Sequence, residues 1–272
     1  MTSVDTLIEA LPYIREFRGE RFVIRCPAQL DEARREALSR DIGMLRFVGV
    51  KAVLVHPADS PFAEGNVAVR GENHRLVHAL GDYGKATGLA GSDGAPRYLL
   101  SISSAGEVEV DPDLVLHVID DYTPVIEAVA VTPSGDAAKA DPDLAAARVA
   151  VALGAYKVLF VVGDHRVRAE QPDESGEISE MCSSDDVVSL ARMDPELKSA
   201  FRGAVEAVRS GRVTFGHLIP DDHPHGMLLE LFTDRGYGTK IRSEASWQEA
   251  EVDNPKKYTQ RGYFCWGTDP EE

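Results

Sequence analysis

Apolar positions along the chain follow two alternating patterns, one typical of helices and one typical of buried strands. In residues 4–17 and 30–49 the apolar side chains recur every three or four positions, which predicts two amphipathic helices. The runs RFVIRC at 21–26 and VKAVLVH at 50–56 are mostly apolar, which predicts buried strands. A strand, a helix and a second buried strand in this order indicate a right-handed parallel crossover.

The alternation of strand and helix patterns continues as far as residue 242. Further helices are predicted at 74–84, 112–122, 141–155, 183–191, 195–211 and 225–236. Further strands are predicted at 97–104 and 106–110, which read as a hairpin, and at 123–136, 156–164 and 212–219. In the helix at 141–155, Asp141 fits the N-cap, Pro142 the first turn and Gly154 the end. Residues 59–72 read as a loop, and strands alternating with helices indicate a three-layer α/β fold.

Composition narrows the classes of partner. The chain has 272 residues, 43% of them hydrophobic, which is enough for the core of one large or two small domains. A formal charge of −16 argues against nucleic acid or an anionic membrane as a partner. The N-terminus lacks the pattern of a signal peptide, and no stretch is as long as a membrane span. Three cysteines lie far apart without a CxxC motif, so we expect a cytoplasmic protein with free thiols.

Several segments match, in order and spacing, those of one known family. They read LIEALPYIREFRGERFVI, ALGDYGKATGLAGSDG, GEVEVDPDLVLHVIDDYTPVIEAVAVTPSGD and PHGMLLELFTDRGYGTKI. On these segments the chain resembles acetylglutamate kinase, of the amino acid kinase superfamily, over about residues 5–242. The resemblance implies the carbamate kinase-like fold, an αβα sandwich around a mainly parallel sheet. Residues 1–160 would then form the N-lobe, which holds the acyl amino acid in the family, and 161–242 the nucleotide lobe. Residues 243–272 read as an irregular extension.

The site motifs of that family are only partly present. Where the family's first strand ends in Lys-aromatic-Gly-Gly, the chain reads RCPA (25–28), and where the second ends in His-Gly-Gly-Gly-Pro it reads HPADS (56–60). Glycine-rich loops hold phosphate through backbone N–H groups, and Pro27 and Pro57 each remove one such donor. Asp59 adds a negative charge to the second loop. The use of ATP and Mg²⁺, which the resemblance implies, is therefore expected to be weak or lost.

The resemblance also places site residues one by one, although several are of a different type here. The positions of the catalytic residues correspond to Arg25, Asp141 and Lys198, with Arg202 as an alternative to Lys198 on the other side of Ala200. The positions of the substrate contacts correspond to His56, Pro57, Ala58, Arg70 and Ala137. The positions of the nucleotide contacts correspond to Pro27, Gly163 and Asp164. The positions of the regulatory residues, which bind arginine in some members, correspond to Tyr13, His225, Glu230 and Gly236.

Each of these residues also has a purely structural interpretation. Arg25 equally fits an ion pair with an acidic neighbour, and Asp141 equally fits a helix cap. The cluster DDHPH (221–225) is weak evidence for a metal site, and we predict none. Cys26 beside Arg25 is a candidate reactive thiolate, but a buried free thiol is the commoner case.

Three functions remain open from the sequence. The first is a diverged protein that has lost standard phosphoryl transfer and binds or transforms an amino-acid-like small molecule. The second is an active ATP-dependent carboxylate kinase with an altered substrate. The third is an arginine-responsive regulatory subunit. The amphipathic helix at 4–17 precedes the first strand, and in the family such helices interlace between dimers, so we expect a homodimer or a homohexamer.

Overall fold

The described part of the chain forms one continuous sheet with helices on both faces. The structure is a computed structural model that describes residues 3–27, 30–58, 71–163, 180–182, 195–234 and 236–242, with the backbone alone at 3–7 and 180–182. Its strands are β1 (Arg21–Arg25), β2 (Lys51–Pro57), β3 (Ala86–Ala90), β4 (Leu100–Ile102), β5 (Val108–Val110), β6 (Thr123–Val131), β7 (Ala137–Lys139), β8 (Lys157–Val162), β9 (Glu180–Cys182), β10 (Phe215–Pro220) and β11 (Thr239–Arg242). Its helices are α1 (Ser3–Phe17), α2 (Glu32–Phe47), α3 (Gly71–Gly81), α4 (Asp113–Val118), α5 (Pro142–Leu153), α6 (Pro195–Arg209) and α7 (Gly226–Phe232).

The sheet is mainly parallel, as the fold class predicted from the sequence requires. Within the described residues its order is β5-β4-β6-β2-β1-β8-β10-β11-β9, with β3 and β7 also paired to β6. The central strands β6, β2, β1, β8 and β10 all run in the same direction. In this register Ile24 of β1 lies between Leu54 of β2 and Leu159 of β8. These strands are apolar on both faces because helices cover both.

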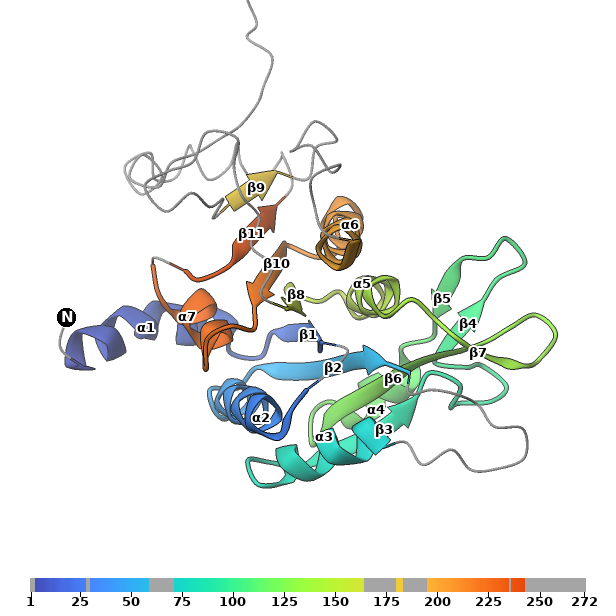
Figure 1. The fold of residues 1–272 in the computed structure, drawn as a ribbon, viewed down its shortest axis with the longest axis horizontal. Coiled ribbons are helices and arrows are strands. Elements are labelled where there is room, and N and C mark those ends of the chain that lie inside the picture. Colours follow the sequence, from blue (N-terminus) through green and yellow to red (C-terminus); the bar gives the residue numbers. More distant parts are fainter. Residues whose placement is uncertain are drawn as a thin grey trace, which may run out of the picture.

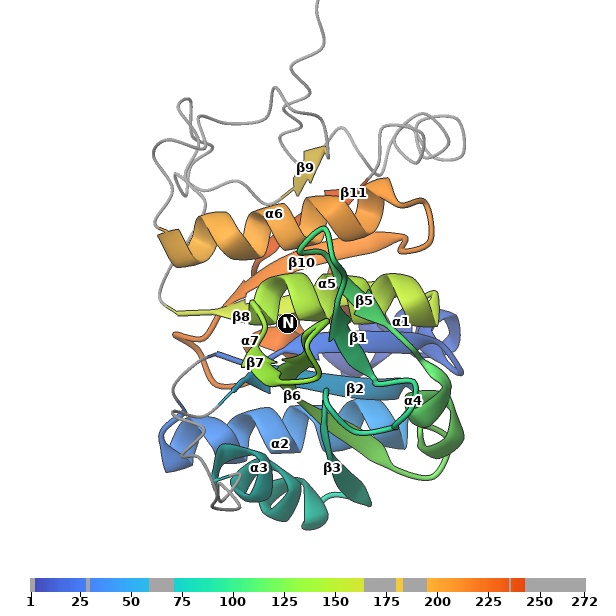
Figure 2. The same ribbon diagram turned by 90° about the vertical axis from the view of Figure 1, so that its right-hand side faces the viewer.

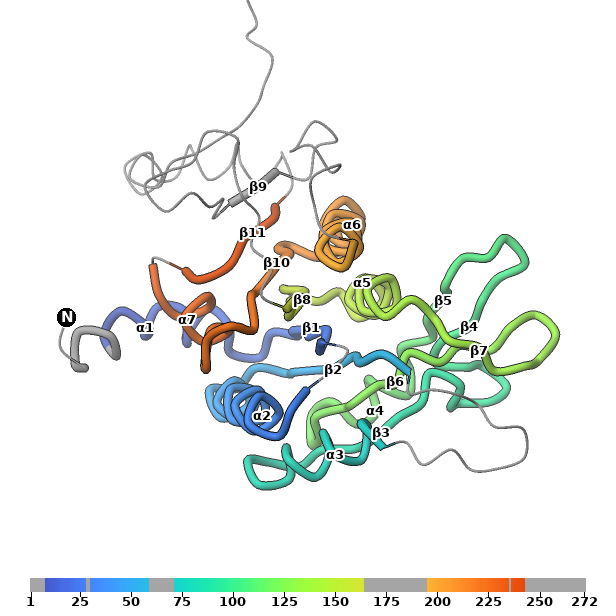
Figure 3. Tube along the Cα trace, viewed as in Figure 1, coloured from blue at the N-terminus to red at the C-terminus, as the bar shows by residue number. Residues whose placement is uncertain are grey.

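Two separate apolar cores lie on the two faces of the sheet. Helices α5 and α6 pack side by side over one face, and α2 and α3 cover the other together with α1 and α7 (Figures 1 and 2). The trace also brings α1, at the start of the chain, beside α7 near its end (Figure 3). The hydroxyl of Tyr13 on α1 donates to Asp234 after α7 across this junction. This arrangement confirms the three-layer sandwich.

The local signals at 141–155 are confirmed in detail. The Asp141 carboxylate accepts from the backbone N–H of Asp143 at 2.9 Å and of Leu144 at 3.2 Å, so it caps α5. Gly154 ends the helix at φ 56°, in the left-handed region that glycine adopts without strain. Pro142 occupies the first turn, where its missing N–H has no cost.

Several expectations differ from the structure, and the pattern of apolar residues did not predict strands β3 and β11. The helix expected at 74–84 begins at Gly71 and ends at Gly81, because the polar Glu72 and Asn73 are held by partners on neighbouring elements. The short strand β7, which pairs antiparallel with the end of β6, was not expected. The loop at 59–70, the helix at 183–191 and the extension at 243–272 lie outside the described residues. In the described part of the chain, no helix combines the length and apolarity needed to cross a membrane.

Candidate functional site

The carboxyl ends of the central strands form the edge at which we build the site. Strand β1 lies between β2, which follows it through α2, and β8, which follows α5. Helices α2 and α5 lie on opposite faces, so the chain connections diverge on the two sides of β1. In open α/β sheets, ligands bind at such a switch point, outside the carboxyl ends of the strands. Arg25, the last residue of β1, stands at this point.

Arg25 is buried and carries two carboxylate partners. Its Nε lies 2.6 Å from Asp143 Oδ1, and its Nη1 lies 3.3 Å from Glu196 Oε1. Nη1 also donates to the carbonyl oxygen of Val161 on β8 at 3.3 Å. Burial raises the pKa of Asp143, and the positive charge of Arg25 acts in the opposite direction. The two carboxylates come from the first turns of α5 and α6, so Arg25 ties β1 to both helices.

Asp143, which the sequence analysis did not single out, is the buried acidic partner of Arg25. The contacts of Asp141 in the structure are those of a helix cap, whereas Asp143 is the ion-pair partner of Arg25. A signal was present in the sequence, because Asp143 precedes Ala146, Ala147 and Ala150 at helical spacing. All three alanines are buried. A charged residue on an otherwise apolar face indicates a buried partner.

The other proposed catalytic position lies on α6. Lys198 is half-buried in the first turn of this helix, two residues after Glu196. Ala200, which lies between Lys198 and Arg202, is fully buried. Arg202 is exposed on the same helix.

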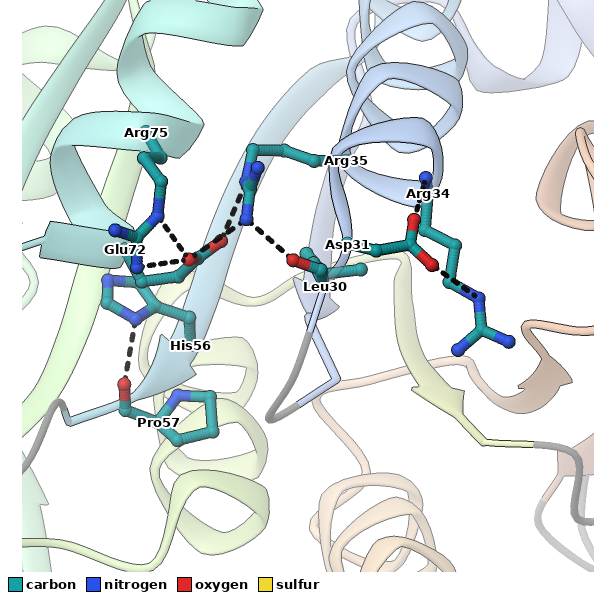
Figure 4. Close-up of polar contacts among 8 residues, drawn as sticks. All are labelled: Leu30, Asp31, Arg34, Arg35, His56, Pro57, Glu72 and Arg75. Atoms are coloured by element: carbon teal, nitrogen blue, oxygen red, sulfur yellow. Dashed lines mark hydrogen bonds and ion pairs between the residues drawn. The ribbon is translucent and has the colours of Figure 1, made fainter.

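His56 links β2 to α3 and has both ring nitrogens engaged. Its Nδ1 lies 2.8 Å from the carbonyl oxygen of Pro57, to which it donates (Figure 4). Its Nε2 lies 3.0 Å from the amide nitrogen of Asn73, which also donates to Val125 O at 2.9 Å. This pattern fits the neutral imidazole with its proton on Nδ1. Pro57 and Ala58 follow at the half-buried end of the strand.

The arginines at the start of α2 are also paired with carboxylates of the chain. Arg35 holds Glu72 of α3 through Nε at 2.9 Å and Nη2 at 3.2 Å, and Nη2 donates to Leu30 O at 2.6 Å (Figure 4). Arg34 lies 3.2 Å from Asp221, which follows β10, and 3.8 Å from Asp31. Asp31 caps α2 by accepting from the backbone N–H of Arg34 at 2.8 Å. Arg34 and Arg35 are thus neutralised by carboxylates of the chain itself.

The remaining predicted site residues are spread around this edge or beyond it. Pro27 is buried directly after β1, and Gly163 is half-buried after β8. Ala137 lies exposed in β7, opposite Val131. Arg70 and Asp164 lie outside the described residues. Cys26, the candidate reactive thiolate, is buried. Burial raises the pKa of its thiol to about 12, so the thiol is protonated at neutral pH.

The four regulatory positions separate into two places. Glu230 accepts from His217 Nδ1 at 2.7 Å, and from the backbone N–H groups of Tyr237 and Gly238 at 2.7 Å each. Gly236 lies beside it at φ 69°, where an added Cβ would be 2.9 Å from Glu230 Oε2. His225 contacts Asp41 of α2 at 2.5 Å. Tyr13 donates to Asp234 just after the C-terminal end of α7, near Gly236, whereas His225 lies at the N-terminal end of that helix.

A buried lysine beside Glu230 was also missed. Lys157 Nζ lies 3.5 Å from His217 Nε2 and 4.4 to 5.1 Å from the ring centres of Phe215, Phe17 and Tyr156. Burial, with the nearby Lys240, lowers the pKa of Lys157 to about 7. Burial, with the charge of Lys157, lowers the pKa of His217 to about 4. Lys157 begins β8 and His217 lies within β10, and both strands were predicted from runs of apolar residues. A polar residue in such a run was the signal that could have identified them.

The relatives that match the chain in sequence are acetylglutamate kinases. No protein-family model matches it. The acetylglutamate kinase of Sulfurihydrogenibium sp. (strain YO3AOP1) is 30% identical over 87% of the chain and 97% of the relative. The acetylglutamate kinase of Methanosarcina barkeri (strain Fusaro / DSM 804) is 32% identical over 87% of the chain and 88% of the relative.

Solved structures agree on the fold. N-acetylglutamate synthase from Neisseria gonorrhoeae, complexed with coenzyme A and N-acetyl-glutamate, matches 90% of the chain with a TM-score of 0.70 at 21% identity. The chain spans 64% of that protein. Carbamate kinase from Giardia lamblia, bound to AMP-PNP, matches 83% of the chain and 99% of its own length, with a TM-score of 0.56 at 12% identity. The neighbours confirm the carbamate kinase-like fold.

Proposed function

The chain belongs to the acetylglutamate kinase family, and we propose that it binds an amino-acid-like small molecule without standard ATP-dependent phosphoryl transfer. The observation that carries this proposal is the internal neutralisation of Arg25, Arg34 and Arg35 by carboxylates of the chain itself. A site for a transferring phosphoryl group needs positive charge and N–H donors directed at that group. The residues at this edge do not fit ATP and Mg²⁺ well.

Two further features of the edge support the loss of phosphoryl transfer. Pro27 and Pro57 have no N–H group to offer a phosphate. The buried methyl group of Ala200 replaces a lysine charge. Removing one donor to a developing oxyanion costs roughly 3 kcal/mol of transition-state stabilisation. Losing several such donors would make the rate of phosphoryl transfer too low for an ordinary kinase.

The division into lobes enters this proposal as a working hypothesis. Residues 1–160 would hold the ligand, and 161–242 would correspond to the family's nucleotide lobe. Arg25 reaches Glu196 across that division, and Arg34 reaches Asp221. Both contacts lie at the sheet edge, so a ligand there would touch both lobes.

Calorimetry with Mg-ATP tests the proposal directly. We expect no binding at micromolar concentrations and no phosphoryl transfer to N-acetylglutamate. The Sulfurihydrogenibium acetylglutamate kinase, assayed in parallel, serves as the positive control. A dissociation constant in the micromolar range would refute the proposal and favour the active kinase, with Arg25, Asp141 and Lys198 or Arg202 as its machinery.

One observation favours a second candidate, an arginine-responsive subunit. The N-terminal helix and the segment after α7 meet through Tyr13 and Asp234, whose backbone N–H in turn donates to Glu9 at 2.7 Å. Glu230 lies nearby, with a side chain only 5% exposed and already engaged by His217. An arginine guanidinium would therefore have to replace an existing contact of Glu230. We expect L-arginine, and not L-lysine, to raise the melting temperature, and no shift at saturating L-arginine removes this candidate.

A further inference from the structure

The two carboxylates on Arg25 differ in character. Asp143 approaches to 2.6 Å and its side chain is 5% exposed, whereas Glu196 lies at 3.3 Å and its side chain is 37% exposed. A buried partner is fixed, because separating it would leave an uncompensated charge inside the protein. A partly exposed partner at the longer distance gains little from the contact. Glu196 is therefore the replaceable member of the pair.

Arg25 also retains capacity for another acceptor. A guanidinium has five N–H donors, and its contacts with the described residues use Nε and Nη1. The Nε contact with Asp143 is short but lies outside hydrogen-bond geometry, and both atoms are buried. Buried donors that lack a well-aligned acceptor cost free energy. An incoming group with two oxygens would use the donors of Arg25 better than the single Glu196 contact does.

We propose that a ligand carboxylate binds Arg25 by displacing the side chain of Glu196, which acts as an internal competitor for the site. This inference rests on the proposed function, because it takes the sheet edge as the place where an amino-acid-like molecule binds. Arg25 stands at the switch point between β1 and β8, where its Nη1 already contacts Val161 O. Glu196 reaches it from α6 and thereby covers Arg25 in the unliganded protein.

The charges around Arg25 select a carboxylate over a phosphate. Exchanging one carboxylate for another keeps a single negative charge in direct contact with Nη1 of Arg25, and a carboxylate matches the planar fork of arginine with two parallel hydrogen bonds. A phosphate dianion would add negative charge beside Asp143, whose pKa is already raised by burial and also by the nearby Asp141 and Glu196. A ligand carboxylate can therefore take the place of Glu196, whereas the neighbouring acidic groups disfavour a phosphate dianion.

Two variants of α6 with equal net charge test the exchange. Glu196→Gln removes the competitor, and Glu206→Gln, on the same helix, removes a carboxylate that instead pairs with Arg148 at 2.7 Å and is 41% exposed. Glutarate and inorganic phosphate serve as probes in calorimetric titrations. We expect Glu196→Gln to bind glutarate about two- to five-fold more tightly than the wild type, the scale of a partly exposed ion pair. Glu206→Gln is expected to match the wild type.

Three outcomes would overturn the exchange. They are equal tightening in both variants, no detectable glutarate binding by Glu196→Gln, or an equal gain for phosphate and glutarate. The first indicates a general effect of net charge, the second that Arg25 does not receive a carboxylate, and the third that the site accepts any anion. Micromolar Mg-ATP binding by the wild type would refute the proposed function but leave the comparison of the two variants intact, so the two failures are distinguishable.

Discussion

Removing the arginine from the buried pair is the sharpest test of how this edge is held together. In Arg25→Met, Asp143 would keep its buried position, with a side chain only 5% exposed, and lose its counterion. Breaking a buried pair by removing one partner costs about 3–5 kcal/mol, since the remaining charge stays desolvated. The lost contact with Glu196 adds little, because that carboxylate is partly exposed. We therefore expect a loss of about 3–5 kcal/mol in the free energy of unfolding at pH 7.5.

The loss should depend on pH with a definite sign. Burial raises the pKa of Asp143 above its ordinary value of 3.8, and Arg25 opposes this rise. Removing Arg25 raises the pKa further, so the folded variant binds a proton more tightly than the unfolded chain does. A carboxyl group with a raised folded pKa loses stability as the pH rises from 3.8 through that folded pKa. The deficit of Arg25→Met should therefore be larger at pH 7.5 than near pH 5.

Urea denaturation at the two pH values measures both effects. Arg40→Met serves as the matched control, because Arg40 pairs with Glu36 on the surface, with side chains 54% and 44% exposed. We expect the control to move the unfolding midpoint little at either pH. The double variant Arg25→Met/Asp143→Leu should recover much of the loss, since it removes the stranded charge. Equal midpoints for Arg25→Met and Arg40→Met, or a deficit that does not change with pH, would refute this account of the pair.

Two further predictions concern the N-terminal helix and the cluster beneath it. Lys157 has a folded pKa of about 7 against 10.5 for an ordinary lysine, so the unfolded chain takes up its proton first as the pH falls, and wild-type stability should rise between pH 7 and 10.5. Lys157→Met should flatten that rise in thermal denaturation, and an unchanged slope would show that another group causes it. Ile8 and Leu11 on α1 are 61% and 50% exposed, which fits burial against another subunit. Light scattering should show at least a dimer for the full chain and a smaller species for a chain beginning at Gly19; identical monomers would remove the interlacing hypothesis.

Local signals in the sequence predicted the elements whose cause is local. Asp141 and Gly154 lie at the two ends of α5, and the sequence indicated both because a cap needs only the backbone beside it. The resemblance supplied what periodicity alone could not, namely the carbamate kinase-like fold with its mainly parallel sheet. The short strand β7 was missed because its pairing with β6 is a tertiary event with few residues to show it.

The candidate site was less predictable, because pairs of distant residues decide it. The resemblance grouped Asp141 with Arg25 among the catalytic positions, but it is Asp143 that pairs with Arg25, while Asp141 caps the helix. The regulatory positions include His225 and Glu230, but the histidine that contacts Glu230 is His217, which no motif indicated. Side-chain direction on a helix or strand, rather than spacing in a motif, determines which charges meet.

The contact between Tyr13 and Asp234 joins residues 221 positions apart in the chain, and this has a consequence for synthesis on the ribosome. The segment that holds the hydroxyl of Tyr13 leaves the exit tunnel 221 residues after the first helix does. At roughly 5–20 residues per second, this delay is about 10 to 45 s. During that interval Phe17 of α1 has no Phe232 of α7 beside it, so this helix is available to chaperones or to the same helix of a neighbouring nascent chain. A polysome carrying several copies would bring such helices together before any one chain is complete.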